Sequence, residues 1–94
     1  MKDLTLQQVY DVINIDEEHI ALFGIKEPYL IGRRQRSKTI GAAIAHEHSV
    51  MDPTKLPKET LLGAESARLF RELCVWILTQ NPTDAMRELL ASIE

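Results

Sequence analysis

The sequence predicts an all-α protein, in which a long kinked N-terminal helix packs with shorter helices in an intertwined dimer. Apolar residues recur at the three- and four-residue spacing of an α-helix in every long segment of the chain. No segment shows the alternation of apolar and polar residues that is typical of a β-strand. Prolines and glycines divide the helical pattern into separate elements.

The first predicted helix runs from about residue 5 to residue 48, with Thr5 as its N-cap. Its apolar stripe consists of Val9, Ile13, Ile20, Phe23 and Leu30. Pro28 interrupts this helix, because a proline ring clashes with the carbonyl four residues earlier, here that of Gly24. The chain either bends within one helix or breaks near residues 24–27, with Pro28 in the first turn of a second helix. The stripe keeps its phase across Pro28, which favours one kinked helix.

A short irregular segment and two further helices complete the predicted chain. Asp52-Pro53 is typical of an N-cap followed by proline at the first helical position, and Pro57 limits the helix that begins there. Apolar residues at helical spacing then predict a third helix over residues 64–80. The run Asn81-Pro82-Thr83-Asp84 ends this helix and begins the last one, at about 83–92.

Length and composition predict one cytoplasmic domain over residues 1–94. The chain is 45% apolar and 27% charged, which is ordinary for a globular protein, and its net charge of −3 gives no general attraction for nucleic acid. No apolar run approaches the length of about 18 residues that marks a membrane span, and the N-terminus lacks a signal peptide's apolar core. The single cysteine, Cys74, fits a reducing compartment. Because so short a chain buries a modest core, we expect a homodimer along the long helix.

Charged residues on and near the apolar stripes are the first functional candidates. Asp16, Lys26 and Glu27 fall on the stripes, where an unpaired charge is costly to bury. We expect them to form ion pairs, to reach solvent from the edge of the core, or to bind a ligand. A basic run follows, made up of Arg33, Arg34, Arg36 and Lys38. A helix spreads these cations around more than half of its circumference, so the run is a solvated face, a polyanion contact, or a pocket into which one or two of them turn.

Three short motifs follow one another along the chain: Ile15-Asp16 with Ile20, Leu22-Phe23 and Lys26; Val50-Met51-Asp52-Pro53-Thr54-Lys55; and Leu69-Phe70-Arg71-Glu72-Leu73 with Gln80. In this order they resemble the motifs of the small all-helical chorismate mutases, over about two thirds of the chain. The spacing from Asp52 to Phe70 is about three helical turns shorter than in that family. We therefore expect its second helix to be truncated or absent here.

The resemblance implies an isomerase of shikimate-derived metabolism that rearranges chorismate or a related dianionic dicarboxylate without a cofactor. It implies catalytic roles for Lys26, Lys55 and Gln80. It also implies substrate contacts for Arg36, Lys38 and Asp52. A pericyclic rearrangement needs a folded substrate and cations at its carboxylates and ether oxygen, but no nucleophile. The family's partner-donated arginine has no counterpart before Arg33, and lysines stand at two arginine positions, so the resemblance implies a weak or degenerate site.

A non-catalytic helical adaptor or regulator is the alternative function, and it would bind another protein through the seam of the long helix. The enzyme requires cations that converge in a closed polar pocket. The adaptor requires an exposed apolar groove, with those cations directed into solvent. His46 and His48 lack the spacing of zinc ligands on a helix, so we expect no metal site. We expect neither a membrane nor a nucleic-acid partner for either function.

Overall fold

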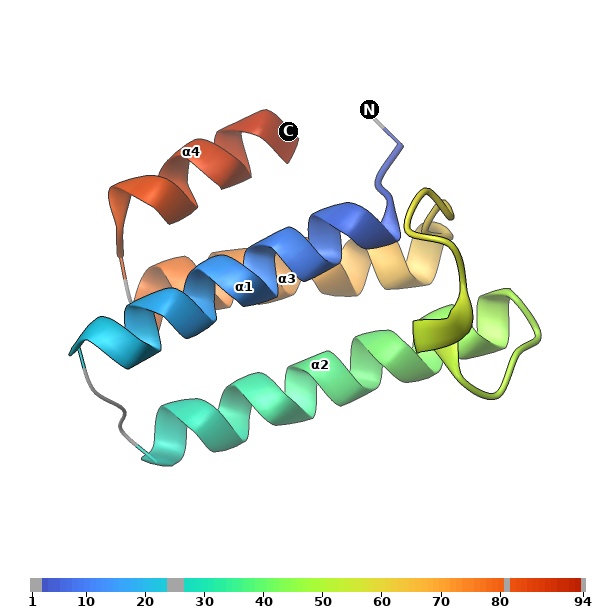
Figure 1. Ribbon diagram of the computed structural model, residues 1–94, viewed down its shortest axis with the longest axis horizontal. Coiled ribbons are helices and arrows are strands. Elements are labelled where there is room, and N and C mark those ends of the chain that lie inside the picture. Colours follow the sequence, from blue (N-terminus) through green and yellow to red (C-terminus); the bar gives the residue numbers. More distant parts are fainter. Residues whose placement is uncertain (1–2, 24–26, 81, 94) are drawn as a thin grey trace.

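The computed structural model of the chain describes residues 3–23, 27–80 and 82–93. Four α-helices occur in these residues: α1 (Leu6–Phe23), α2 (Glu27–Glu47), α3 (Ala64–Gln80) and α4 (Asp84–Ile93) (Figure 1). A short 3-10 helix, η1 (Pro53–Lys55), lies in the connection between α2 and α3. The described residues contain no β-strand, since the pairing of Thr5 with Leu61 is an isolated bridge. The predicted all-α class is confirmed, and the two C-terminal helices agree with their predicted bounds to within one residue.

The predicted kinked helix over residues 5–48 is wrong. Two helices, α1 and α2, occupy this range and run in opposite directions (Figure 1). Pro28 is the second residue of α2, where its missing N–H leaves no intrahelical hydrogen bond unmade and its fixed φ suits a helix start. A single helix of the predicted length would extend about 66 Å, whereas the longest dimension of the folded chain is 37 Å. The apolar stripe continues across Pro28 because each of the two helices buries its own apolar face.

Helix α3 is the centre of the fold, and the other three α-helices pack around it (Figure 1). Its buried residues include Phe70, Leu73, Cys74 and Ile77, whose three- and four-residue spacing places them on one face. Helix α2 packs along α3, and α1 packs on α3 and α4. No described Cα atom of α1 lies within 8 Å of one in α2. Helices α1 and α2 therefore form two separate walls over α3.

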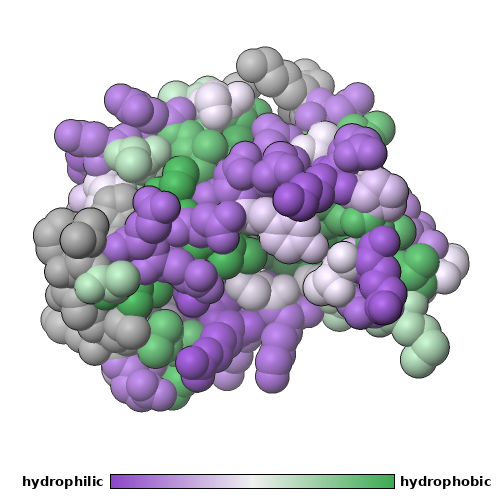
Figure 2. Space-filling model, viewed as in Figure 1, coloured by the Kyte–Doolittle hydropathy of each residue, from purple (hydrophilic) through white to green (hydrophobic). Residues whose placement is uncertain are grey.

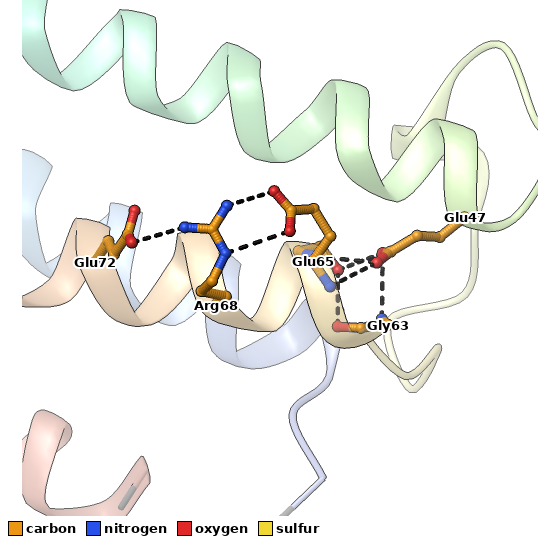
Figure 3. Close-up of polar contacts among 6 residues, drawn as sticks. Glu47, Gly63, Glu65, Arg68 and Glu72 are labelled. Carbon is orange, nitrogen blue, oxygen red and sulfur yellow. Dashed lines mark hydrogen bonds and ion pairs between the residues drawn. The ribbon is translucent and has the colours of Figure 1, made fainter.

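The end of α2 is joined to the start of α3 by the side chain of Glu47 (Figure 3). Its Oε1 accepts hydrogen bonds from the Gly63 N–H at 3.2 Å and the Ser66 hydroxyl at 2.5 Å. Its Oε2 accepts from the backbone N–H groups of Glu65 and Ser66, each at 3.1 Å. These N–H groups lack intrahelical partners at a helix N-terminus, and the helix dipole favours an anion there. Glu47 therefore caps α3 from a different helix and fixes the angle between the two.

Acidification should weaken the fold through Glu47. Burial acts to raise the pKa of the Glu47 carboxyl, but the hydrogen bonds from Ser66, Gly63 and Glu65 outweigh it and hold the pKa below its ordinary value of 4.5. A carboxyl with a lowered folded pKa contributes stability above its unfolded pKa, and loses that contribution as pH falls through the folded pKa. We expect Glu47→Gln to lower the free energy of unfolding by about 1 kcal/mol at pH 7, as for a lost cap. The difference in free energy of unfolding between Glu47→Gln and wild type should be smaller at pH 3.

Urea unfolding of both proteins at pH 7 and pH 3, followed by circular dichroism, measures this difference. Comparison of the two proteins at each pH cancels the contribution of the other carboxyl groups. A difference that stays the same at both pH values would contradict the assigned role of the ionised Glu47 carboxylate.

Candidate functional site

A groove lies between α1 and α2, with α3 beneath it. Its lining consists of Leu6, Val9, Tyr10 and Ile13 from α1, Ser37, Ile40, Gly41 and Ile44 from α2, Pro53 and Thr54 from η1, and Leu73 from α3. The cavity volume is about 150 Å³. Figure 2, drawn from the same side as Figure 1, shows green apolar surface in the band between the two helices, among purple hydrophilic side chains. The groove is thus an apolar cavity: its floor consists of buried core residues, and Tyr10, Ile13 and Ser37 are partly exposed at its mouth.

The groove follows from helical spacing in two antiparallel helices. The α1 wall repeats at three and four residues from Leu6 to Ile13, and the α2 wall does so from Ser37 to Ile44. Because the helices run in opposite directions, the Leu6 end of α1 faces the Ile44 end of α2 (Figure 1). Gly41 has no side chain to fill the groove on the α2 side. A Cβ placed there would meet no neighbour closer than Pro53 Cγ at 4.0 Å. The space beside Gly41 is therefore open to an occupant.

A buried polar cluster of Asp16, Tyr29 and Arg33 lies one helical turn beyond the groove-lining residues Ile13 and Ser37. Asp16 Oδ2 lies 3.2 Å from Arg33 Nε, and the two side chains are 0% and 11% exposed. The Tyr29 hydroxyl donates a short hydrogen bond to Asp16 Oδ1. Burial, reinforced by this hydrogen bond, raises the pKa of Tyr29 well above its usual range. The cluster joins α1 to α2 where their backbones stay apart, and of the three alternatives for Asp16 it selects the ion pair.

The ion pair in this cluster is close but imperfectly aligned. Asp16 Oδ2 and Arg33 Nε have no hydrogen-bond partner in the described part of the chain, although they lie within ion-pair distance of each other. The guanidinium also reaches Glu17, whose Oε1 lies 3.6 Å from Arg33 Nη2. Glu17 is 60% exposed, so this second pair contributes little to stability.

Aromatic stacking holds the start of α2 against α3. The Tyr29 and Trp76 rings stack with centroids 5.1 Å apart and an interplanar angle of 10°. The Arg36 guanidinium carbon lies 4.2 Å from the Trp76 ring centroid, and its Nη1 donates to the Gly32 carbonyl at 3.1 Å. A Cβ at Gly32 would lie 2.8 Å from the Trp76 ring, so glycine permits this close approach. Arg36, a predicted substrate contact, therefore packs on an aromatic ring.

None of the other predicted site residues that the structure describes lines the groove. Lys38 on α2 and Lys55 on η1 are exposed, and Asp52 caps η1 by accepting a hydrogen bond from the Thr54 N–H at 3.0 Å. Gln80 is the last residue of α3, at the opposite end of that helix from η1 (Figure 1). Within one chain, Lys55 and Gln80 therefore do not meet around a common ligand. The remaining predicted residue, Lys26, lies outside the described residues.

Sequence reasoning missed the main features of this region. It did not identify Gly41 as part of a groove or Glu47 as the cap of α3. It also did not predict the stacking of Tyr29 on Trp76. The groove residues did carry a signal, since small residues at positions 37 and 41 interrupt the apolar side of α2 one turn apart. A glycine in a helix interior costs roughly 0.5–1 kcal/mol relative to alanine, so its presence can mark a packing or binding requirement.

Comparison with known proteins gives no assignment: no family model, no curated protein and no solved structure matches this chain. In the residues that the structure describes, no group of three or more His, Cys, Asp or Glu side chains could hold a metal ion. None of the helices in the described ranges is both long and apolar enough to cross a membrane. The apolar groove and the cations beside it are the features from which a function can be inferred.

Proposed function

We propose that this protein is a non-catalytic helical adaptor, which holds another protein by an apolar side chain inserted between α1 and α2. The observation that supports this function is the apolar cavity of about 150 Å³ between two helices whose backbones do not approach each other. Concave, mostly apolar cavities between helices are a common form of binding site. Of the described cations that the resemblance assigns to the site, Lys38 and Lys55 are exposed and Arg36 packs on Trp76, which also favours the adaptor.

The groove has the size of one large side chain. An apolar cavity of about 150 Å³ can bind a molecule such as benzene, so one leucine or phenylalanine side chain of a partner would fill it. Burial of such a side chain contributes about 1.5–3 kcal/mol. An amphipathic helix laid along the groove is the recognition mode that presents an apolar side chain in this way. Further contacts along the rim would then set the affinity and the choice of partner.

Photocrosslinking from the rim of the groove tests the adaptor. Asn14 is exposed on α1 and follows the lining residue Tyr10 by four positions, so the two share one face of the helix. Ala42 is exposed on α2 and has no lining residue three or four positions away. We expect a photoreactive amino acid at position 14 to form one discrete adduct in cells of the source organism, and the same amino acid at position 42 to form none. Gly41→Leu should fill the groove and abolish the adduct, whereas Gly41→Ala should retain it.

Three outcomes would overturn the adaptor. Adducts of equal yield from positions 14 and 42 would mean that capture is not specific to the groove. An adduct with the mass of two copies of this chain would make a second copy the occupant. An adduct that persists in Gly41→Leu would place the contact outside the groove. Light scattering at micromolar concentration separately tests the predicted homodimer, which gives twice the mass of 10.7 kDa.

The chorismate-mutase-like function stays a prediction, supported by the three motifs in the sequence. Asp16 of the first motif is the buried partner of Arg33. Lys38 and Lys55 are exposed, and Arg36 packs on the Trp76 ring. We therefore expect weak or absent turnover of chorismate, because each missing donor to the transition state typically costs about 2.7–4 kcal/mol of barrier. Loss of chorismate absorbance with purified protein measures this turnover against the uncatalysed reaction. Turnover on the order of 10 s⁻¹, a typical enzyme value, would contradict the adaptor as the main function.

A further inference from the structure

The geometry points to an acidic amphipathic helix as the partner segment, an inference that rests on the proposed function of the groove. We infer this from three cations on one side of the groove, namely Arg34 and Lys38 of α2 and Lys55 of η1, which are called the basic rim below. All three are exposed. None has an ion pair or a side-chain hydrogen bond within the described residues.

The basic rim is placed beside the apolar lining by helical spacing. Arg34 precedes the lining residues Ser37 and Gly41 by three and seven residues, so the three share one face of α2. Lys38 follows Arg34 by four residues and precedes Gly41 by three, which puts it on the solvent side of the same face. Lys55 directly follows the lining residue Thr54 in η1. The cations therefore form a row along one wall, at the place where a bound helix would present its polar flank.

The opposite wall carries no matching row of free acidic groups. Its exposed residues next to the lining are Asn14 and Glu17, and the Glu17 carboxylate lies 3.6 Å from Arg33 Nη2. At physiological ionic strength the screening length is about 8 Å, so the net charge of −3 matters less to a bound segment than the cations that touch it. A segment with acidic side chains on one flank would complement the basic rim, and a segment with basic side chains there would be repelled.

The chain's own acidic helix is a poor candidate for this partner segment. Helix α1 carries Asp11, Asp16, Glu17 and Glu18. Its apolar side chains Val9, Val12 and Ile20 are already buried in the fold, so a second copy could not offer them without unfolding. The groove wall from Leu6 to Ile13 spans about 10 Å along the helix axis, or two helical turns. A partner helix would therefore present apolar anchors at positions i and i+4 and acidic residues on the flank beside α2.

Two synthetic helical peptides test this partner chemistry. Both carry leucine at i and i+4 in an alanine background, and they differ in having glutamate or lysine at the flanking positions. Fluorescence polarisation of the labelled peptides should show binding of the glutamate peptide to the wild-type protein, with at least about tenfold weaker binding of the lysine peptide, which corresponds to 1.4 kcal/mol. Binding of the glutamate peptide should weaken as salt is raised, because exposed charges are screened.

Charge-reversal variants locate the effect. Lys38→Glu should weaken binding of the glutamate peptide by about three- to tenfold, because an exposed attraction is replaced by a repulsion of similar size. Arg87→Glu makes the same change of charge on α4, where Arg87 pairs with Asp84 away from the groove, and it should leave the affinity within about twofold. Gly41→Leu should abolish binding of both peptides, since it fills the groove.

The outcomes separate the two proposals. Equal affinity for the glutamate and lysine peptides, lost in Gly41→Leu, would overturn the acidic partner while leaving the apolar groove as the binding site. Binding of the glutamate peptide that survives Gly41→Leu would show that the cations attract it to another surface, which overturns both proposals. If neither peptide binds at about 1 mM, although the photoreactive amino acid at position 14 forms its adduct, the acidic helix is the wrong class of partner. The proposed adaptor function is then retained.

Discussion

Replacement of Asp16 by alanine should lower the free energy of unfolding by about 3–5 kcal/mol, because it leaves the Arg33 guanidinium buried without its main counter-charge. Arg33 is 11% exposed and lies 3.2 Å from Asp16 Oδ2, so water cannot readily replace the lost carboxylate. The same change removes the acceptor of the Tyr29 hydroxyl. Since domains of this size are stable by about 5–15 kcal/mol, a loss of this magnitude is a large share of the total. Urea unfolding followed by circular dichroism measures the difference.

An exposed ion pair provides the matched control for Asp16. Arg87 and Asp84 lie 3.4 Å apart on α4 and are 59% and 96% exposed, so Asp84→Ala should change stability by less than about 1 kcal/mol. Replacement of both Asp16 and Arg33 by leucine should recover much of the loss, because an apolar pair leaves no buried charge without a partner. A cost below about 1 kcal/mol for Asp16→Ala would mean that the cluster does not hold α1 to α2.

Alanine at the two glycines of α2 that face other elements should change stability in opposite directions. At Gly41 a Cβ meets Pro53 Cγ at 4.0 Å, an ordinary contact, so Gly41→Ala should stabilise the protein by about 0.5–1 kcal/mol through helix propensity. At Gly32 a Cβ would lie 2.8 Å from the Trp76 ring, which also stacks with Tyr29 and contacts Arg36. Overpacking of this kind costs about 1–3 kcal/mol, which exceeds the same gain in propensity. Gly32→Ala should therefore be destabilising.

Trp76 reports directly on the Gly32 substitution, because it is the only tryptophan in the sequence. We expect Gly32→Ala to shift its fluorescence and near-ultraviolet circular dichroism, and Gly41→Ala to leave both unchanged. Equal stabilisation by the two alanines, with an unaltered Trp76 signal, would contradict the stack of Tyr29, Trp76 and Arg36. The Gly41→Ala protein is also the correct reference for Gly41→Leu in the binding experiments, since it separates helix propensity from filling of the groove.

The helical class and most element bounds were decided by local features of the sequence. Apolar spacing and the Asn81–Asp84 signal placed α3 and α4 correctly, because helix periodicity and capping depend on residues close together in the chain. The same spacing puts Phe70, Cys74 and Ile77 on one face of α3, and all three are buried in the fold. The cost of burying a charge marked Asp16 as a residue that needs a partner, a ligand or solvent, and the structure pairs it with Arg33.

Only the tertiary structure decided how Pro28 is used and what the polar residues contact. A continuous stripe suits one kinked helix and two antiparallel helices equally well, and the packing of both helices on α3 selects the second. That choice brings Asp16 to Arg33, Trp76 to Arg36 and Glu47 to the start of α3, pairs that are 17, 40 and about 18 residues apart in the chain. The groove arises in the same way, because α1 and α2 both rest on α3 while their backbones stay apart. No local pattern encodes a space between two segments, so the candidate site could be found only once the fold was known.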